Sequence, residues 1–150
     1  MDHHTFTSGY YYLASTYTQH PEGFEKAAEQ AAEQTSLFAR AGIAVLSPIA
    51  HGHALTQSEH GRELPLTHDF WLPYDEAFMR GAKGLLFIKM DGWEKSIGMH
   101  YEYGFFRGME RTTIVTDPVT TLEEAASVVA YATSLEPTPP PYCPPLRSSR

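Results

Sequence analysis

The sequence predicts an α/β protein, a flavodoxin-like or Rossmann-like three-layer sandwich with a parallel sheet of four or five strands. Short apolar runs of β-prone residues alternate along the chain with longer segments of helical periodicity. Gly42 separates a helical segment from an apolar run, which is typical of a crossover between parallel strands. Polar residues follow the first three strand segments, where open α/β sheets bind ligands.

The first strand–helix–strand unit has the clearest sequence pattern. Residues 10–15 are aromatic and predict a strand, and the polar residues 15–21 predict a loop. Alanine, leucine and phenylalanine then share one stripe over residues 23–40, which predicts a helix that ends at Gly42. The apolar residues 43–47 predict a second strand, parallel to the first.

The middle of the chain is less regular. Residues 49–66 contain glycine, proline, histidine and glutamate, so we expect a long loop with a short helix near residues 56–60. Aromatic side chains predict a helix over residues 68–80. The apolar run that follows predicts a third strand over residues 85–90.

The last third of the chain continues the alternation of predicted strands and helices. A turn at Asp91 leads to a helix over residues 96–109, and β-branched residues predict a fourth strand over residues 112–116. Thr121 followed by Glu124 is a capping-box pattern that begins a helix ending near residue 134. We therefore expect an N-terminal extension at residues 1–9, one α/β domain at residues 10–135 and a proline-rich tail at residues 136–150.

The amino-acid composition limits the kinds of molecule that the protein could bind. The 150-residue chain has a net charge of −7 and no cluster of lysine or arginine, which argues against binding a nucleic-acid polymer. A small anionic nucleotide remains compatible, because helix N-termini hold phosphate without net positive charge. With one cysteine, Cys143, no secretion signal and no apolar run long enough to span a membrane, we expect a cytoplasmic protein without membrane contacts.

Two carboxylates are candidates for catalysis. Glu102 lies in the helix of residues 96–109 among large apolar neighbours, where burial would raise its pKa. Such carboxylates act as nucleophiles at anomeric carbons, although a solvated helix carboxylate is the ordinary alternative. Asp75 lies on an aromatic-rich helix and could pass a proton to a leaving base; a surface position is equally compatible with its sequence.

Other candidates lie near strand ends. Ser96 and Gly98 begin a helix, where Ser96 could cap the backbone or bind a phosphate. Tyr17 and Trp93 could present a ring to a base. Metal ligation by histidines near residues 51–68 is less compatible, because zinc sites need three or four ligands at workable geometry; we expect a histidine that touches substrate, and neither metal nor cofactor.

Three motifs carry a family resemblance, namely Tyr12-Leu13-Ala14-Ser15-Thr16-Tyr17, Ser47-Pro48-Ile49-Ala50-His51-Gly52-His53 and the segment from Asp91 to Glu102. They resemble a small bacterial and phage family of uncharacterised domains, DUF1937. That family is similar to the nucleoside 2-deoxyribosyltransferases and the deoxynucleoside 5′-monophosphate N-glycosidases. The resemblance covers roughly residues 10–118.

The resemblance implies an activity. Glu102 matches the nucleophile that forms a glycosyl-enzyme, and Asp75 matches the aspartate that handles the base proton. Ser96 stands where the transferases have an aspartate and the monophosphate glycosidases a serine-bearing loop, which favours a nucleotide and hydrolysis. The glycine-rich first loop of the glycosidases is replaced by Ser15-Thr16-Tyr17. The relatives form dimers or larger assemblies, so the resemblance also implies a homodimer or homotetramer.

Three hypotheses remain open at this point. The first is an enzyme that cleaves or transfers an N-glycosidic bond of a nucleotide or nucleoside, with Glu102 and Asp75 catalytic. Its substrate-binding residues would be Ser15, Tyr17, His51, Asp91, Trp93, Ser96 and Gly98. The second is a non-catalytic nucleotide or nucleotide-sugar binding or sensing domain of the same fold. The third is a metal-dependent hydrolase that uses His51, His53 and His60.

Overall fold

The computed structural model describes residues 6–135. Residues 1–5 and 136–150, which include the expected proline-rich tail, lie outside the described residues. None of the helices in the described range has the length and apolarity that crossing a bilayer demands. The elements follow one another in the expected alternation: β1 (Tyr11–Ala14), α1 (Phe24–Arg40), β2 (Val45–Leu46), α2 (Pro48–Gln57), η1 (Gly61–Glu63), α3 (His68–Gly81), β3 (Gly84–Ile88), η2 (Trp93–Lys95), α4 (Ile97–Gly108), β4 (Thr112–Thr116) and α5 (Leu122–Ser134).

The sheet confirms the predicted fold class. Four strands pair in the order β2-β1-β3-β4, and every pairing is parallel. This order agrees with the flavodoxin-like arrangement. In that arrangement, ligands bind at the edge of the sheet where the connections that follow two neighbouring strands run to opposite faces of the sheet. β1 and β3 are the central strands, with Tyr11 opposite both Val45 and Gly84.

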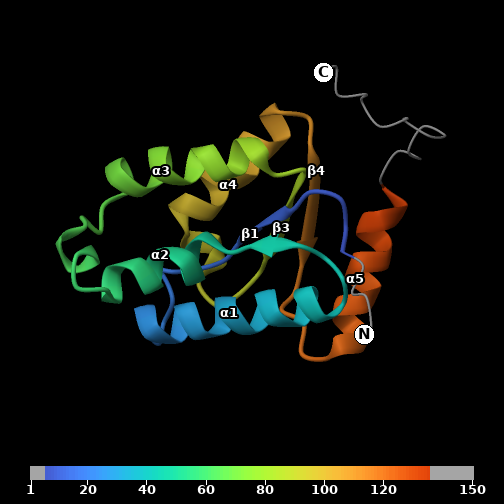
Figure 1. The fold of residues 1–150 in the computed structure, drawn as a ribbon, viewed down its shortest axis with the longest axis horizontal. Helices are drawn as coiled ribbons and strands as arrows, with labels where there is room; N and C mark the ends of the chain where they lie inside the picture. Colours follow the sequence, from blue (N-terminus) through green and yellow to red (C-terminus); the bar gives the residue numbers. More distant parts are fainter. Residues whose placement is uncertain (1–5, 136–150) are drawn as a thin grey trace, which may run out of the picture.

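Two helical layers cover the sheet, one on each face (Figure 1). Along the central strands, successive side chains pack alternately against one layer and the other. Leu13 and Leu86 belong to the core shared with α1 and α5. Tyr12 and Leu85 belong to the core shared with α3 and α4. Since both faces of the strands are buried, the strands are apolar throughout, as parallel sheets require. The three-layer prediction is therefore confirmed.

The predicted helix ends at Gly42 and Thr121 are confirmed. Gly42 has a φ of 93°, the left-handed conformation that favours glycine after a helix. The Thr121 hydroxyl accepts the N–H of Glu124 at 3.1 Å and begins α5. The Glu124 carboxylate accepts the N–H of Thr120 in return, one residue before the position expected for a capping box.

The loop expected over residues 49–66 is wrong for residues 49–57, which are helical, and right for the irregular residues after them; the short helix expected near residues 56–60 is wrong. A helix, α2, begins directly after β2, because the Ser47 hydroxyl accepts the N–H of Ala50 at 3.1 Å and Pro48 occupies the first turn. Gly52 does not break this helix. A Cβ at Gly52 would lie 3.3 Å from the Trp71 ring, so glycine here permits close packing of α2 against α3.

Candidate functional site

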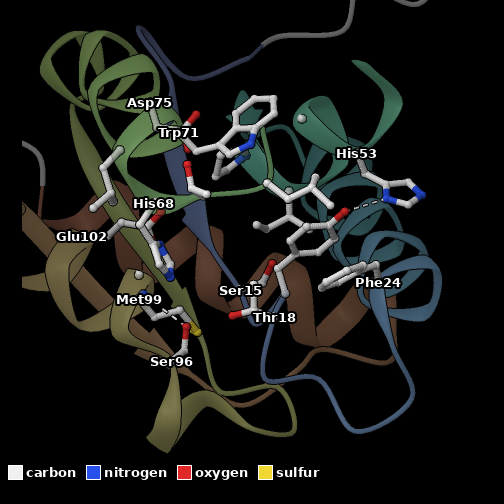
Figure 2. Close-up of a pocket in the computed structure, with 18 of the residues that line it drawn as sticks. Ser15, Thr18, Phe24, His53, His68, Trp71, Asp75, Ser96, Met99 and Glu102 are labelled. Atoms are coloured by element: carbon white, nitrogen blue, oxygen red, sulfur yellow. Dashed lines mark hydrogen bonds between the residues drawn. The ribbon is translucent and has the colours of Figure 1, made fainter. Parts of the chain in front are cut away.

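A pocket lies at the carboxyl ends of β1 and β3, enclosed by the loop after β1 and by parts of α2, α3 and α4 (Figure 2). This is the edge of the sheet at which the sequence predicted a site. Six of the nine predicted site residues line it: Ser15, Tyr17, Asp75, Ser96, Gly98 and Glu102.

Glu102 is the most deeply buried carboxyl group in the pocket. It lies on the inward side of α4 with 7% of its surface exposed, which excludes the ordinary solvated position. The Tyr12 hydroxyl donates a hydrogen bond of 2.8 Å to its Oε1 atom. The pKa of Glu102 is raised to about 8: burial raises it most, the Tyr12 hydrogen bond lowers it, and the charge of Asp75 raises it.

Asp75 provides a second carboxyl group from another helix. It lies on α3 and lines the same pocket, and burial raises its pKa to about 7. The two groups interact electrostatically, since the charge of Asp75 raises the pKa of Glu102. Such a pair of carboxyl groups, with pKa values displaced toward neutrality in a cleft, is typical of a site for acid–base or nucleophilic chemistry.

Tyr12 was not among the predicted site residues, because the aromatic residues 10–15 were taken only as a strand. It is fully buried, and its hydroxyl reaches Glu102 on α4. The signal in the sequence is indirect: a strand tyrosine on the α3–α4 face needs a partner for its hydroxyl. Glu102 is that partner.

Replacing Tyr12 by phenylalanine is expected to raise the pKa of Glu102 by about one unit or more. A hydrogen bond to a charged group is worth roughly 1.5–3 kcal/mol, and 1.36 kcal/mol corresponds to one pKa unit. Carbon-13 NMR titration of the glutamate side chains measures this. Tyr101→Phe is the matched control, since the Tyr101 hydroxyl is bonded to Glu76 and not to Glu102. An unchanged pKa of Glu102 in Tyr12→Phe would contradict the role of the hydrogen bond.

Ser96 caps α4 and faces the pocket at the same time. Its hydroxyl accepts the N–H of Met99 at 3.3 Å, and the side chain is buried. The N–H groups of Ile97 and Gly98 in this first turn have no acceptor within the helix. The two expectations for Ser96, a cap and a polar group at an anion site, therefore describe compatible features of one residue.

Ser15 has an unusual hydrogen-bonding state. It follows the last residue of β1 and is 4% exposed. Within residues 6–135, its Oγ atom is the only buried side-chain nitrogen or oxygen without a hydrogen-bond partner. An unpaired buried hydroxyl costs free energy, so its presence in the pocket wall indicates a group that a bound molecule would satisfy.

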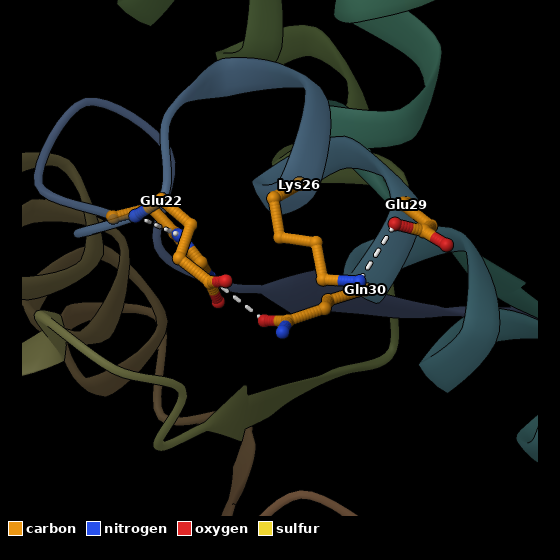
Figure 3. A network of polar contacts seen from close by, with 5 residues as sticks. Glu22, Lys26, Glu29 and Gln30 are labelled. Atoms are coloured by element: carbon orange, nitrogen blue, oxygen red, sulfur yellow. Dashed lines mark hydrogen bonds and ion pairs between the residues drawn. The ribbon is translucent and has the colours of Figure 1, made fainter.

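The loop after β1 is held in place by two sets of contacts. The Tyr17 hydroxyl and His53 Nδ1 share a hydrogen bond of 2.9 Å, and the Tyr17 ring stacks on Phe24. At its far end, His20 Nδ1 accepts the N–H of Glu22, so Nε2 carries the proton and donates it to Gln30 Oε1 at 2.8 Å (Figure 3). These contacts fix the loop to α1 and α2.

Three predicted residues do not reach the pocket. His51 shares a hydrogen bond with the Tyr74 hydroxyl, because neighbours two apart on a helix differ by about 200° and His53, not His51, faces the pocket. Trp93 packs against Phe87 and His100 instead of forming a pocket wall. Asp91 is exposed on the turn after β3.

The site also contains His53, His68 and Trp71, which the sequence did not single out as substrate contacts. Helical periodicity in α2 would have identified His53 once that segment was taken as a helix. Within residues 6–135, no group of three or more histidine, cysteine, aspartate or glutamate side chains is placed to hold a metal ion. The three histidines of the metal-hydrolase hypothesis are therefore not assembled into a metal site.

The comparisons with known proteins identify a family. No curated protein matches the chain, so the similarity to N-glycosidases and deoxyribosyltransferases stays a prediction. The profile described as "Domain of unknown function (DUF1937)" matches residues 9–117, which include β1 to β4 and every residue of the pocket. The match confirms the family resemblance carried by the three sequence motifs. The chain therefore belongs to the DUF1937 family.

Proposed function

We propose that this protein cleaves or transfers the N-glycosidic bond of a nucleotide or nucleoside, with Glu102 as nucleophile and Asp75 as general acid and base. The observation that carries the proposal is the pair of carboxyl groups that α3 and α4 direct into one pocket. Burial raises the pKa of both, and Tyr12 holds one oxygen of Glu102. The similarity of the sequence motifs to glycosyl-transferring enzymes agrees with this arrangement.

Each group acts in both steps of the reaction. The free Oε2 of ionised Glu102 attacks the anomeric carbon, the bond between that carbon and the base nitrogen breaks, and Asp75 gives its proton to the departing base. A glycosyl ester of Glu102 results. Water, deprotonated by Asp75, then releases the sugar and regenerates Glu102; a second base in place of water gives transfer.

The working form of the pair carries one proton, on Asp75. In the free protein the pKa of Glu102, about 8, lies above that of Asp75, about 7, so a single proton resides on Glu102 and must pass to Asp75 when the substrate binds. The Tyr12 hydrogen bond favours ionised Glu102. Tyr12 is therefore a positioning residue that prepares the nucleophile.

The remainder of the pocket suits a flat heterocycle. Phe24, Ile49 and Trp71 form apolar parts of its wall. Rings and aliphatic side chains of this kind bind a base through stacking and burial, while a few polar groups set its orientation. The base would lie toward α1 and α2, and the sugar toward Glu102 (Figure 2).

Incubation with a panel of deoxynucleotides, ribonucleotides and nucleosides tests the proposal. We expect free base in the chromatogram for at least one substrate, and a glycosyl adduct on the peptide that contains Glu102 by mass spectrometry after acid quenching. Glu94→Gln, a change at an exposed glutamate outside the pocket, is the control and should retain activity.

Two outcomes would count against this function. Equal base release by the wild type and Glu102→Gln would show that Glu102 is not the nucleophile. Tight binding of a nucleotide or nucleotide sugar without any release of base would favour the alternative, a non-catalytic binding or sensing domain of the same fold.

A further inference from the structure

β4 forms an edge of the sheet, and among the described strands it pairs with β3 alone. The C=O group of Thr116 accepts the N–H of Lys89, the residue after β3, so Thr116 faces β3. Because backbone groups alternate in direction along a strand, the N–H and C=O groups of Thr113 and Val115 face away from β3. Within residues 6–135, no other segment supplies a backbone partner to these outward groups.

The position beside β4 is filled in related sheets. In the five-stranded flavodoxin-like order, a fifth strand lies next to the fourth. The sequence after α5 contains six prolines within residues 136–150, and proline has no N–H group to donate to a ladder. The chain's own C-terminal sequence is therefore poorly suited to complete the sheet, and an edge of this kind is a template for a strand from another chain.

The sequence of β4 lacks the features that usually prevent pairing at an edge. All five residues, Thr112–Thr116, are β-branched, and the strand contains no proline, no charge and no bulge. Val115 is 49% exposed and lies opposite Phe87, whose ring contacts the exposed ring of Tyr103. Exposed apolar surface therefore borders the edge on the side of α4.

The strand is complementary to a second copy of itself. When two copies run antiparallel about a two-fold axis at Ile114, Thr113 of each copy lies opposite Val115 of the other. These two residues then exchange both backbone hydrogen bonds, because theirs are the groups that face outward. Arg111 lies opposite Asp117 in the same register, so opposite charges meet at both ends of the paired strands.

Other contacts already hold the two charged residues in place. The Arg111 guanidinium donates to three backbone carbonyl groups at the end of α3, among them that of Met79 at 3.2 Å. Asp117 pairs with Lys89 at 3.1 Å, yet 82% of its side chain is exposed. A positive charge on an opposite strand would therefore meet an accessible carboxylate of fixed position. Charge pairs at the border of an interface set its register more than its affinity.

We propose that β4 is an interaction surface to which a second copy of this chain adds its own β4, antiparallel and centred on Ile114. The two four-stranded sheets then form one continuous sheet across the two-fold axis. The family resemblance implies an assembly without specifying its surface, and this pairing does not depend on the proposed catalysis. No residue of β4 lines the pocket, so each pocket stays within one chain.

Sedimentation analysis combined with amide hydrogen exchange tests the proposal on the full chain. We expect the wild type to have twice the mass of one chain at high concentration and to dissociate on dilution. The N–H groups of Thr113 and Val115 should be protected in the dimer and exchange rapidly in the monomer. The N–H group of Ile114 faces β3 and should be protected in both, which makes it the internal reference.

Val115→Lys should raise the dissociation constant of the dimer by about tenfold or more, because lysine discourages edge pairing and the substitution occurs twice in a symmetric interface. Val115→Thr keeps a β-branched side chain and should retain the dimer. Ile97→Lys is the matched control, since Ile97 is 72% exposed at the start of α4, outside the edge strand, and the dimer should persist.

Three results would overturn the proposal. One is a wild type that stays monomeric at high concentration. Another is a dimer that Ile97→Lys breaks and Val115→Lys leaves intact, which would place the interface on α4. The last is protection of the Thr113 and Val115 N–H groups in a monomer, which would show that another part of the same chain covers the edge.

Discussion

Glutamine in place of Glu102 is expected to abolish base release and, at the same time, to stabilise the protein. Activity should fall by ~10³-fold or more, since removal of a covalent nucleophile costs several orders of magnitude. Stability should rise because an amide does not ionise in the buried position that raises the pKa of Glu102 to about 8. The amide carbonyl of the substituted side chain would still accept the Tyr12 hydrogen bond.

The pH dependence of this gain has a definite direction. The pKa of Glu102 in the folded protein lies above its ordinary value of 4.5. The stability associated with the protonated carboxyl group is therefore complete below pH 4.5 and is lost as the pH rises through about 8. Glu102→Gln avoids this loss, so the difference in unfolding free energy should grow from near zero at pH 4.5 to roughly 1–3 kcal/mol at pH 8.

Urea unfolding of both proteins at pH 5 and pH 8 measures the difference. Glu94→Gln serves as control, because Glu94 is exposed and its replacement should leave the pH dependence unchanged. A variant that loses activity but is as stable as the wild type at both pH values would show that Glu102 is not held in an unfavourable ionisation state.

Alanine at Gly92 is expected to be among the most damaging single substitutions. Gly92 has a φ of 88°, and a Cβ there would lie 2.2 Å from the backbone oxygen of Gln19. The turn after β3 is thus pressed against the loop after β1, with no flexible side chain between them that could move aside. We expect a loss of about 2–4 kcal/mol in unfolding free energy, from backbone strain and displacement of the loop.

Gly104→Ala is the matched control for this substitution. Gly104 lies within α4, and a Cβ there meets nothing within 4 Å, so alanine should stabilise the helix by up to about 1 kcal/mol. Chemical denaturation of the two variants therefore should give changes of opposite sign. Equal stability of Gly92→Ala and Gly104→Ala would contradict the close approach of the two loops.

The sequence was a good guide to the sheet because the strands are buried on both faces. A strand such as Gly84–Ile88 is apolar at every position, so its signal is strong and its length is clear. Gly42 and Thr121 were correctly placed because each helix end depends on neighbouring residues alone. The strand order β2-β1-β3-β4 was not predicted, because the crossover rule fixes the hand of each connection and not which strands become neighbours.

The pocket was harder to predict, because its residues depend on contacts between distant segments. α2 was taken as a loop, since Gly52 and the histidines weaken a helical pattern and only packing against Trp71 explains the glycine. That error placed His51 at the pocket in place of His53. His68 could not be singled out before α3 and α4 were seen to begin side by side.

The hydrogen bond between Tyr12 and Glu102 also constrains how the chain acquires its site during synthesis. The two residues are separated by 90 positions, and Tyr12 leaves the ribosome long before its partner. Until α4 has been made, the face of β1 that carries Tyr12 and Ala14 lacks the α4 part of its cover and stays open to other chains. A nascent chain that ends before α4 (Ile97–Gly108) contains Asp75 and most of the other pocket residues but not Glu102. The pair of carboxyl groups can therefore form only after α4 has been made.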